Sequence, residues 1–195
     1  MLRVIITVIV FAIGAASQDA PSKGWEKADK QDPLRGTQYV QYSLEGEYLT
    51  PPRNAAAGTT PSIILRCTPG RYAHGLAHGK LLDGYIFVGG VVDAHVGSDA
   101  SIRTTVEYRL DDGKLQTYYW NHSTDYSSLF FSDIDLNNLL YGHMLAHKEN
   151  TNPQIRKIVL GVPEFLGIEV VMQFDMPDAS EVGDTCGVIW HKRDR

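Results

Sequence analysis

Four of the histidines form two pairs in which the members lie four residues apart. His74 and His78 belong to a glycine-rich stretch, whereas His143 and His147 belong to a leucine-rich one. Two imidazoles at this spacing can bind one metal ion, as in a metal-binding protein or a metal-dependent hydrolase. The second pair lacks the glutamate of the zinc-protease motif, because Met144 follows the first histidine. With this ligand set incomplete, packing or surface histidines are favoured and a metal site is the alternative.

Aromatic, amide and acidic side chains gather in residues 120–126. Trp120 and Tyr126 beside Asn121 and Asp125 could stack on a sugar ring or on a peptide. In the alternative, Trp120 covers an open sheet edge while Ser123 and Asp125 fasten a turn by bonding to backbone N–H groups. The alternative is favoured because serine and aspartate usually have that role in turns.

Ser123 has both a histidine and an aspartate close to it in the sequence, at His122 and Asp125. These residue types form catalytic triads. However, the nucleophile, base and orienting group of a triad come from separated elements, and sequence neighbours seldom meet in those roles. We therefore predict a non-enzymatic protein without a cofactor.

Residues 103–131 carry the clearest structural pattern, because polar and apolar side chains alternate on both sides of Asp112 and Gly113. An Asp-Gly pair is typical of a two-residue hairpin turn with positive φ at both positions. With Asp111 opposite Lys114, the prediction places Val106, Tyr108, Leu110, Leu115, Thr117 and Tyr119 on one face. It places Glu107, Arg109, Gln116, Tyr118 and Trp120 on the other, and a shift of one residue would exchange the two sets.

The 195 residues and the formal charge of −5 are typical of one globular domain and argue against a nucleic-acid partner. Residues 1–17 are predicted to be a signal peptide, since a short apolar run follows Arg3 and small residues follow the run. The apolar run is too short to span a bilayer as a permanent anchor, so no stable membrane anchor is expected after signal cleavage. An uncleaved N-terminal anchor is the alternative. We further predict a flexible segment over 18–35, a single domain over 36–190 and a basic tail over 191–195.

Export changes the meaning of the two cysteines, Cys67 and Cys186. In an oxidising compartment an isolated pair is most simply a disulfide, and the alternative is two buried free thiols.

Further strands are predicted over 39–49, 62–67, 85–89, 155–162 and 167–174, separated by segments rich in proline and glycine. A helix is predicted to follow the hairpin, because Leu136, Leu139, Leu140 and Met144 recur at helical spacing. Residues 177–186 are predicted to form a short return to the second cysteine that could be helical. This pattern favours a mainly β protein, an antiparallel β-sandwich with one α-helix and a long-range disulfide.

The order of several short motifs resembles the type VI secretion-associated VasI/TagO family of exported bacterial proteins. The matching pieces are Arg66-Cys67, Val106 with Arg109 and Asp111, Trp120 with Ser123 and Asp125, Leu129-Phe130, Cys186-Gly187, and upstream Trp25 with Asp32-Pro33-Leu34. The resemblance implies a periplasmic or secreted accessory protein, with a link to a type VI secretion system.

Together these patterns predict an exported binding module whose partner is a protein or a cell-envelope glycan. The candidate binding patch consists of Arg109, Trp120, Asn121, Ser123, Asp125 and Tyr126.

Overall fold

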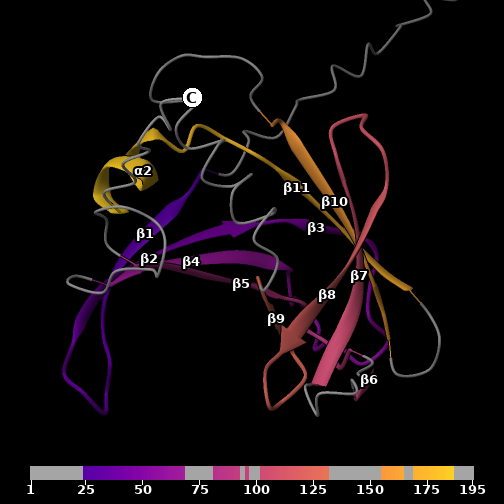
Figure 1. The fold of residues 1–195 in the computed structure, drawn as a ribbon, viewed down its shortest axis with the longest axis horizontal. Coiled ribbons are helices and arrows are strands. Elements are labelled where there is room, and N and C mark those ends of the chain that lie inside the picture. Colours follow the sequence, from indigo (N-terminus) through magenta and orange to yellow (C-terminus); the bar gives the residue numbers. More distant parts are fainter. Residues whose placement is uncertain are drawn as a thin grey trace, which may run out of the picture.

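The computed structural model describes residues 24–68, 81–92, 95–96, 102–131, 155–164 and 169–186. Most of these residues lie in antiparallel strands, which confirms the predicted fold class (Figure 1). The strands are β1 (Glu26–Gln31), β2 (Gln38–Glu45), β3 (Glu47–Thr50), β4 (Ser62–Thr68), β5 (Leu81–Phe87), β6 (His95–Val96), β7 (Ile102–Leu110), β8 (Gln116–His122), β9 (Ser128–Phe130), β10 (Lys157–Pro163) and β11 (Glu169–Asp175). The described helix is α2 (Ser180–Cys186).

The strands form one continuous sheet in the order β1-β2-β4-β5-β9-β8-β7-β10-β11-β3, and β6 pairs with β7 beside this path. Because β3 follows β2 directly in the chain, one bent segment supplies both the second strand and the last strand of the path. Gly46 is the bend, and a Cβ there would lie 2.5 Å from the carbonyl oxygen of Gln173 and 2.6 Å from the Phe174 ring. Only glycine fits this close approach, which brings the two ends of the sheet together.

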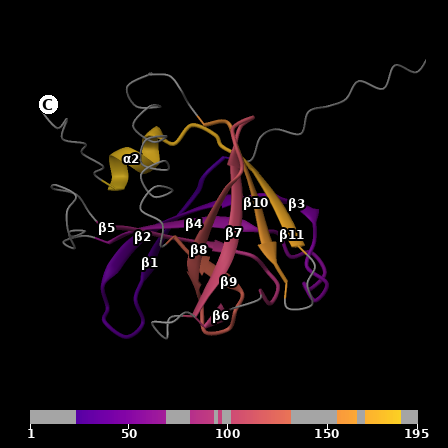
Figure 2. The same ribbon diagram turned by 45° about the vertical axis from the view of Figure 1, so that its right-hand side comes forward.

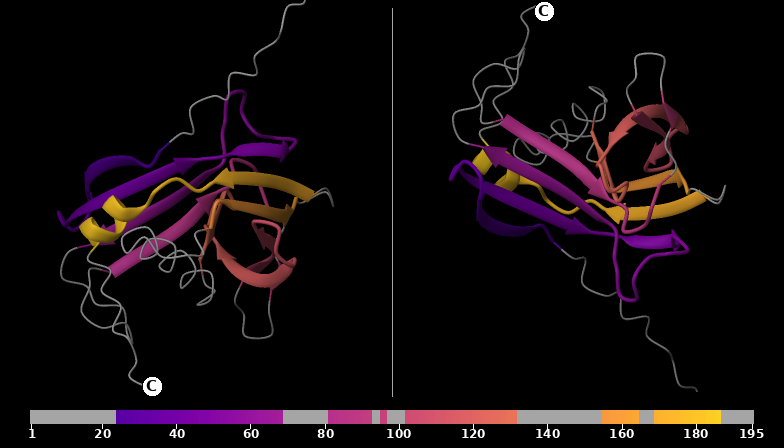
Figure 3. Two further views of the ribbon diagram at one scale, coloured as in Figure 1. Left: turned by 90° about the horizontal axis from the view of Figure 1, so that it is seen from above. Right: turned by 90° about the horizontal axis from the view of Figure 1, so that it is seen from below.

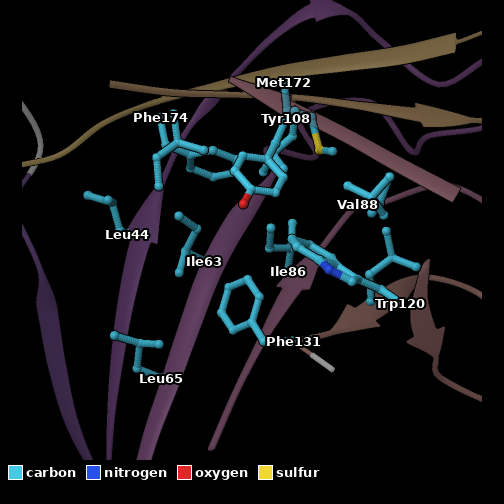
Figure 4. Packing of buried hydrophobic residues seen from close by; sticks show 14 of the residues in the cluster. Leu44, Ile63, Leu65, Ile86, Val88, Tyr108, Trp120, Phe131, Met172 and Phe174 are labelled. Carbon is cyan, nitrogen blue, oxygen red and sulfur yellow. The ribbon is translucent and has the colours of Figure 1, made fainter. Parts of the chain in front are cut away.

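The sheet curls so that its two halves face each other as layers (Figure 3). In Figure 1, β4 runs across the view whereas β7 runs steeply, so the strands of the two layers cross. Alternate residues of β2, β4, β7, β10 and β11 point between the layers and form, with residues of β5, β8 and β9, one apolar core (Figure 4). Leu44, Ile63, Leu65 and Ile86 come from one half, and Val106, Tyr108, Trp120, Leu160, Met172 and Phe174 come from the other.

The predicted disulfide between Cys67 and Cys186 is confirmed, and its Cα atoms are 5.2 Å apart. It joins β4 to the last residue of α2, so the predicted helical return over 177–186 is also correct. Tyr42 donates a hydrogen bond to Thr185 (2.7 Å), and Lys27 forms an ion pair with Glu181 (3.1 Å). The helix is therefore held against β1, β2 and β4 by three different kinds of interaction.

The N-terminal part of the fold begins earlier than the sequence predicts. Instead of a flexible segment up to residue 35, residues 26–31 form β1, which pairs with β2 from Glu26 opposite Ser43 to Gln31 opposite Gln38. The prediction is wrong here because the polar, charged composition of β1 is that of an edge strand, which pairs on one side and faces water on the other. Trp25, directly before β1, is partly buried and packs against the core.

The predicted register of the β7–β8 hairpin is wrong by one residue. Tyr108 lies opposite Gln116 and Thr104 lies opposite Trp120, so Tyr118 and Trp120 share the core-facing side with Val106 and Tyr108. The turn is also different, because the chain leaves β7 after Leu110 and enters β8 at Gln116. Gly113 donates to the carbonyl oxygen of Leu110 (2.9 Å), and the positive φ belongs to Asp111 (+47°) and not to Gly113.

A contact with a distant strand explains this turn. The Asp111 carboxylate accepts hydrogen bonds from the backbone N–H groups of Arg156 (2.9 Å) and Lys157 (2.8 Å), and its own N–H donates to the Lys157 carbonyl oxygen (2.9 Å). Asp111 is therefore fixed against the start of β10, and the turn begins one residue earlier than the Asp-Gly pair predicts.

Several predictions lie outside the described residues: the signal peptide, the helix after the hairpin, both histidine pairs and the basic tail. Among the residues that the structure describes, no helix has the length and apolar character needed to cross a membrane.

Candidate binding surface

The outward side of the β7–β8 hairpin carries an exposed aromatic ring among polar side chains. Tyr119 is 63% exposed and lies opposite Thr105, while Arg103 lies opposite Asn121 and Glu107 opposite Thr117. We call this set the hairpin face: Arg103, Thr105, Glu107, Thr117, Tyr119 and Asn121. It offers one apolar ring surface, hydroxyl and amide groups, and both signs of charge.

The hairpin face rests on a rigid support. Strand β8 is an interior strand, paired with β7 on one side and β9 on the other. Directly behind the face, Trp120 is completely buried and packs edge-on against Phe131, with ring centroids 5.3 Å apart (Figure 4). A surface residue on such a strand loses little conformational freedom when it binds a ligand.

Trp120 is consequently a core residue, which corrects its place in the predicted binding patch. The one-residue difference in register turns Trp120 inward and Tyr119 outward. Trp120 does not cover a sheet edge either, since β8 has a neighbour on both sides. Tyr119 was not predicted as the exposed aromatic because the predicted register depends on the Asp-Gly pair. A register chosen so that the bulkiest residue, Trp120, faces the core would have placed Tyr119 on the exposed side.

Ser123 and Asp125 fasten the β8–β9 turn, which is the alternative interpretation of these residues. Ser123 Oγ donates to Asp125 Oδ1 and accepts from the backbone N–H of Ser128 (3.0 Å), while Asp125 Oδ1 also accepts from the N–H of Ser127 (3.1 Å). The hydrogen bond from Ser123, and then those from Ser127, hold the pKa of Asp125 below its ordinary value.

His122 and Tyr126 stack on each other beside this turn, with ring centroids 4.4 Å apart. His122 Nδ1 lies 2.8 Å from the backbone carbonyl oxygen of Ser123, so it carries the proton of that hydrogen bond. The Ser123 hydroxyl instead bonds to Asp125. The three residues therefore do not have the geometry of a catalytic triad, in which the histidine bonds to the serine hydroxyl.

The other members of the predicted patch divide between two places. Asn121 belongs to the hairpin face, whereas Tyr126 (37% exposed) belongs to the β8–β9 turn, where its carbonyl oxygen accepts a hydrogen bond from the N–H of Val92 (3.1 Å). Arg109 is exposed on the same side of β7 as Thr105 but four residues further along, roughly 13 Å away at the rise of a strand. It lies opposite Val159 of β10. The structure thus brings only Asn121 next to the exposed aromatic ring.

Metal ligands do not gather in the described ranges, where no group of three or more histidine, cysteine or acidic side chains could hold an ion. His74, His78, His143 and His147 lie outside these ranges, so the metal alternative is not addressed by this geometry.

Comparisons with protein-family models, with curated proteins and with solved structures find no match to this chain.

Proposed function

We propose that this protein is an exported, non-enzymatic binding module that contacts its partner through the hairpin face. One observation carries the proposal: Tyr119 is 63% exposed in the middle of an interior strand, with Trp120 buried behind it. A large ring in that position gains contact area on binding and requires no rearrangement of the fold.

The chemistry of the hairpin face suits a sugar ring or a short peptide. The apolar surface of Tyr119 can stack on the carbon face of a sugar or against an apolar side chain. Around it, Asn121 and Thr105 offer donors and acceptors for hydroxyl or amide groups. The proposed partner is accordingly a cell-envelope glycan or an envelope protein.

The compartment is a second part of the proposal. The predicted signal peptide over residues 1–17 and the disulfide between Cys67 and Cys186 both support export to an oxidising compartment such as the periplasm. An association with a type VI secretion system rests on the motif resemblance alone.

The test compares two substitutions that remove similarly exposed side chains. Tyr119 (63%) belongs to the hairpin face, whereas Leu115 (62%) lies in the β7–β8 turn. The purified mature protein and its Tyr119→Ala and Leu115→Ala variants would be titrated against isolated peptidoglycan and, in parallel, against immobilised envelope proteins. We expect Tyr119→Ala to weaken binding by about 1–3 kcal/mol, as for an interface anchor, and Leu115→Ala to leave it unchanged.

Equal binding by both variants at unchanged melting temperature would contradict the proposal. Metal analysis of the same preparation separates the alternative class of function. Stoichiometric, tightly bound zinc would favour a site built from the histidine pairs.

A further inference from the structure

The β1–β2 hairpin projects from the body of the fold (Figures 1 and 2), and its turn is closed by hydrogen bonds. Asp32 organises the turn through both its side chain and its backbone. Its carboxylate accepts from the N–H groups of Leu34 (2.8 Å) and Arg35 (3.0 Å), its carbonyl oxygen accepts from Gly36 (2.8 Å), and its N–H donates to Thr37 (2.9 Å).

Two further features hold this tip in one conformation. Gln31 Nε2 donates to the carbonyl oxygen of Gly36 (3.1 Å), which ties the end of β1 to the far side of the turn. Gly36 has a φ of +66°, a value that glycine adopts without strain. A turn with this many hydrogen bonds keeps its shape without help from the core.

The same turn presents an apolar side chain to water. Leu34 is 94% exposed, more than any other large apolar residue of the described chain. Packing cannot explain its presence, since a leucine at this position contributes almost nothing to the stability of the free protein. A rigid tip that holds out an apolar side chain has the form of an anchor that fits a pocket in another molecule.

Charges around Leu34 indicate what that pocket must contain. The Arg35 side chain is 66% exposed, and its guanidinium lies 3.7 Å from the Asp32 carboxylate. An exposed ion pair of this kind contributes little free energy, so a partner carboxylate can take the place of Asp32. Lys30 is a second exposed cation, at the end of β1. Asp29 and Asp32 balance these two charges, so the tip has no net charge, and Arg35 is the cation that directly follows Leu34.

A lipid surface fits these observations less well than a protein does. Even a full myristoyl chain gives only marginal membrane binding, and one leucine has far fewer carbon atoms to insert. A lipid surface also does not need the single conformation that Asp32 imposes.

We infer that the β1–β2 tip is a docking element that inserts Leu34 into an apolar pocket of a partner protein, with Arg35 paired to a carboxylate on the pocket rim. This interaction is separate from the hairpin face, which lies on other strands. Either binding proposal can therefore be contradicted while the other holds.

The experiment places a photo-crosslinking amino acid, p-benzoylphenylalanine, at position 34 of the full-length protein in cells that produce it naturally. The matched control places it at position 115, where Leu115 is 62% exposed at a different hairpin tip. We expect a discrete protein adduct from position 34 and none from position 115. The cross-linked peptide of the partner, identified by mass spectrometry, should contain apolar residues next to Asp or Glu.

Affinity for that purified partner then tests each chemical element of the inference. Leu34→Ala should weaken binding at least about tenfold, as expected for burying a leucine side chain, while the melting temperature stays unchanged. Arg35→Glu should weaken binding similarly, and reversal of the partner carboxylate to lysine should restore it. Asp32→Ala should weaken binding although it leaves Leu34 in place, because the tip is no longer preorganised.

Three outcomes would overturn the inference. The first is an adduct at position 34 that is no stronger than at position 115. The second is a partner whose affinity is unaffected by Leu34→Ala or Arg35→Glu. The third is Leu34-dependent co-sedimentation with phosphatidylethanolamine–phosphatidylglycerol vesicles in the absence of any protein adduct, which would assign the tip to a membrane surface.

Discussion

Strand β8 lies between two turns that are each fastened by an aspartate but are fixed by different partners. Each turn contains an aspartate and a residue with positive φ, Asp111 (+47°) in one and Tyr126 (+61°) in the other. The Asp111 carboxylate accepts from Arg156 and Lys157, which are 45 and 46 residues away in the chain. Asp125, in contrast, bonds within its own turn, to groups two residues away on either side.

This difference explains why one turn could be predicted and the other could not. The bonds of the β8–β9 turn follow from local preferences of serine and aspartate, which can be predicted from the sequence. The β7–β8 turn depends on where β10 lies, and no property of residues 110–115 contains that information. A tertiary contact there overrides the local preference of the Asp-Gly pair.

The largest effect on stability is expected on the side of β8 that faces the core. Trp120→Ala should lower the free energy of unfolding by about 3–5 kcal/mol, because it empties a fully buried aromatic position. Tyr119→Ala, on the exposed side, should change it by no more than about 0.5 kcal/mol. Urea denaturation of both variants measures the two losses of unfolding free energy. A larger loss for Tyr119→Ala than for Trp120→Ala would favour the register predicted from the Asp-Gly pair.

The next largest effect is expected at the long-range contact. Asp111→Ala should destabilise the fold by about 2 kcal/mol, since two backbone N–H groups of residues 156 and 157 lose a charged acceptor. Asp111→Asn should be milder, because the amide oxygen still accepts and asparagine tolerates positive φ.

Asp112 is the matched control, because it is the exposed neighbour in the same turn. Asp112→Ala should have an effect of at most about 0.5 kcal/mol. Equal losses from the two alanine variants would show that the turn is held locally after all.

Much of the remaining fold follows from periodicity. The predicted strands over 39–49, 62–67 and 167–174 correspond to β2, β4 and β11, and Tyr42, Leu44, Met172 and Phe174 lie at alternate positions in the core. The disulfide followed from the number of cysteines and the predicted compartment. Strand β1 could not be identified, because its charged side chains carry no apolar pattern, and its pairing is backbone hydrogen bonding along β2. The predicted patch and the proposed hairpin face both include residues of the β7–β8 hairpin, but which of its residues face outward depends on the register.

A smaller test concerns Gly113, whose role differs between the two versions of the β7–β8 turn. Its φ is not in the positive range, but a Cβ would lie 2.8 Å from the carbonyl oxygen of Leu110. Gly113→Ala and Gly113→Asn should therefore be equally unfavourable, by about 1–2 kcal/mol, because both add the same Cβ. In a turn with positive φ at this position asparagine would be clearly better tolerated than alanine. The melting temperatures of the two variants decide between these turns.

The smallest expected effect is at Asp125, where the bonds are local and exposed. The hydrogen bonds from Ser123 and Ser127 lower the pKa of Asp125 in the folded state, so they favour its ionised form. Their contribution is fully present above the ordinary carboxylate pKa of about 4 and is lost as the pH falls through the lower folded-state pKa. Asp125→Asn should thus cost about 0.5–1 kcal/mol at pH 7, a modest value because the group is exposed to solvent, and almost nothing in strong acid. Ser123→Ala should remove most of this pH-dependent difference, because it deletes the principal donor.

Urea denaturation at pH 7 and near pH 2, for all four combinations of the two substitutions, measures the coupling between Ser123 and Asp125. A difference between wild type and Asp125→Asn that persists unchanged at low pH would mean that the carboxylate charge has no part in fastening this turn.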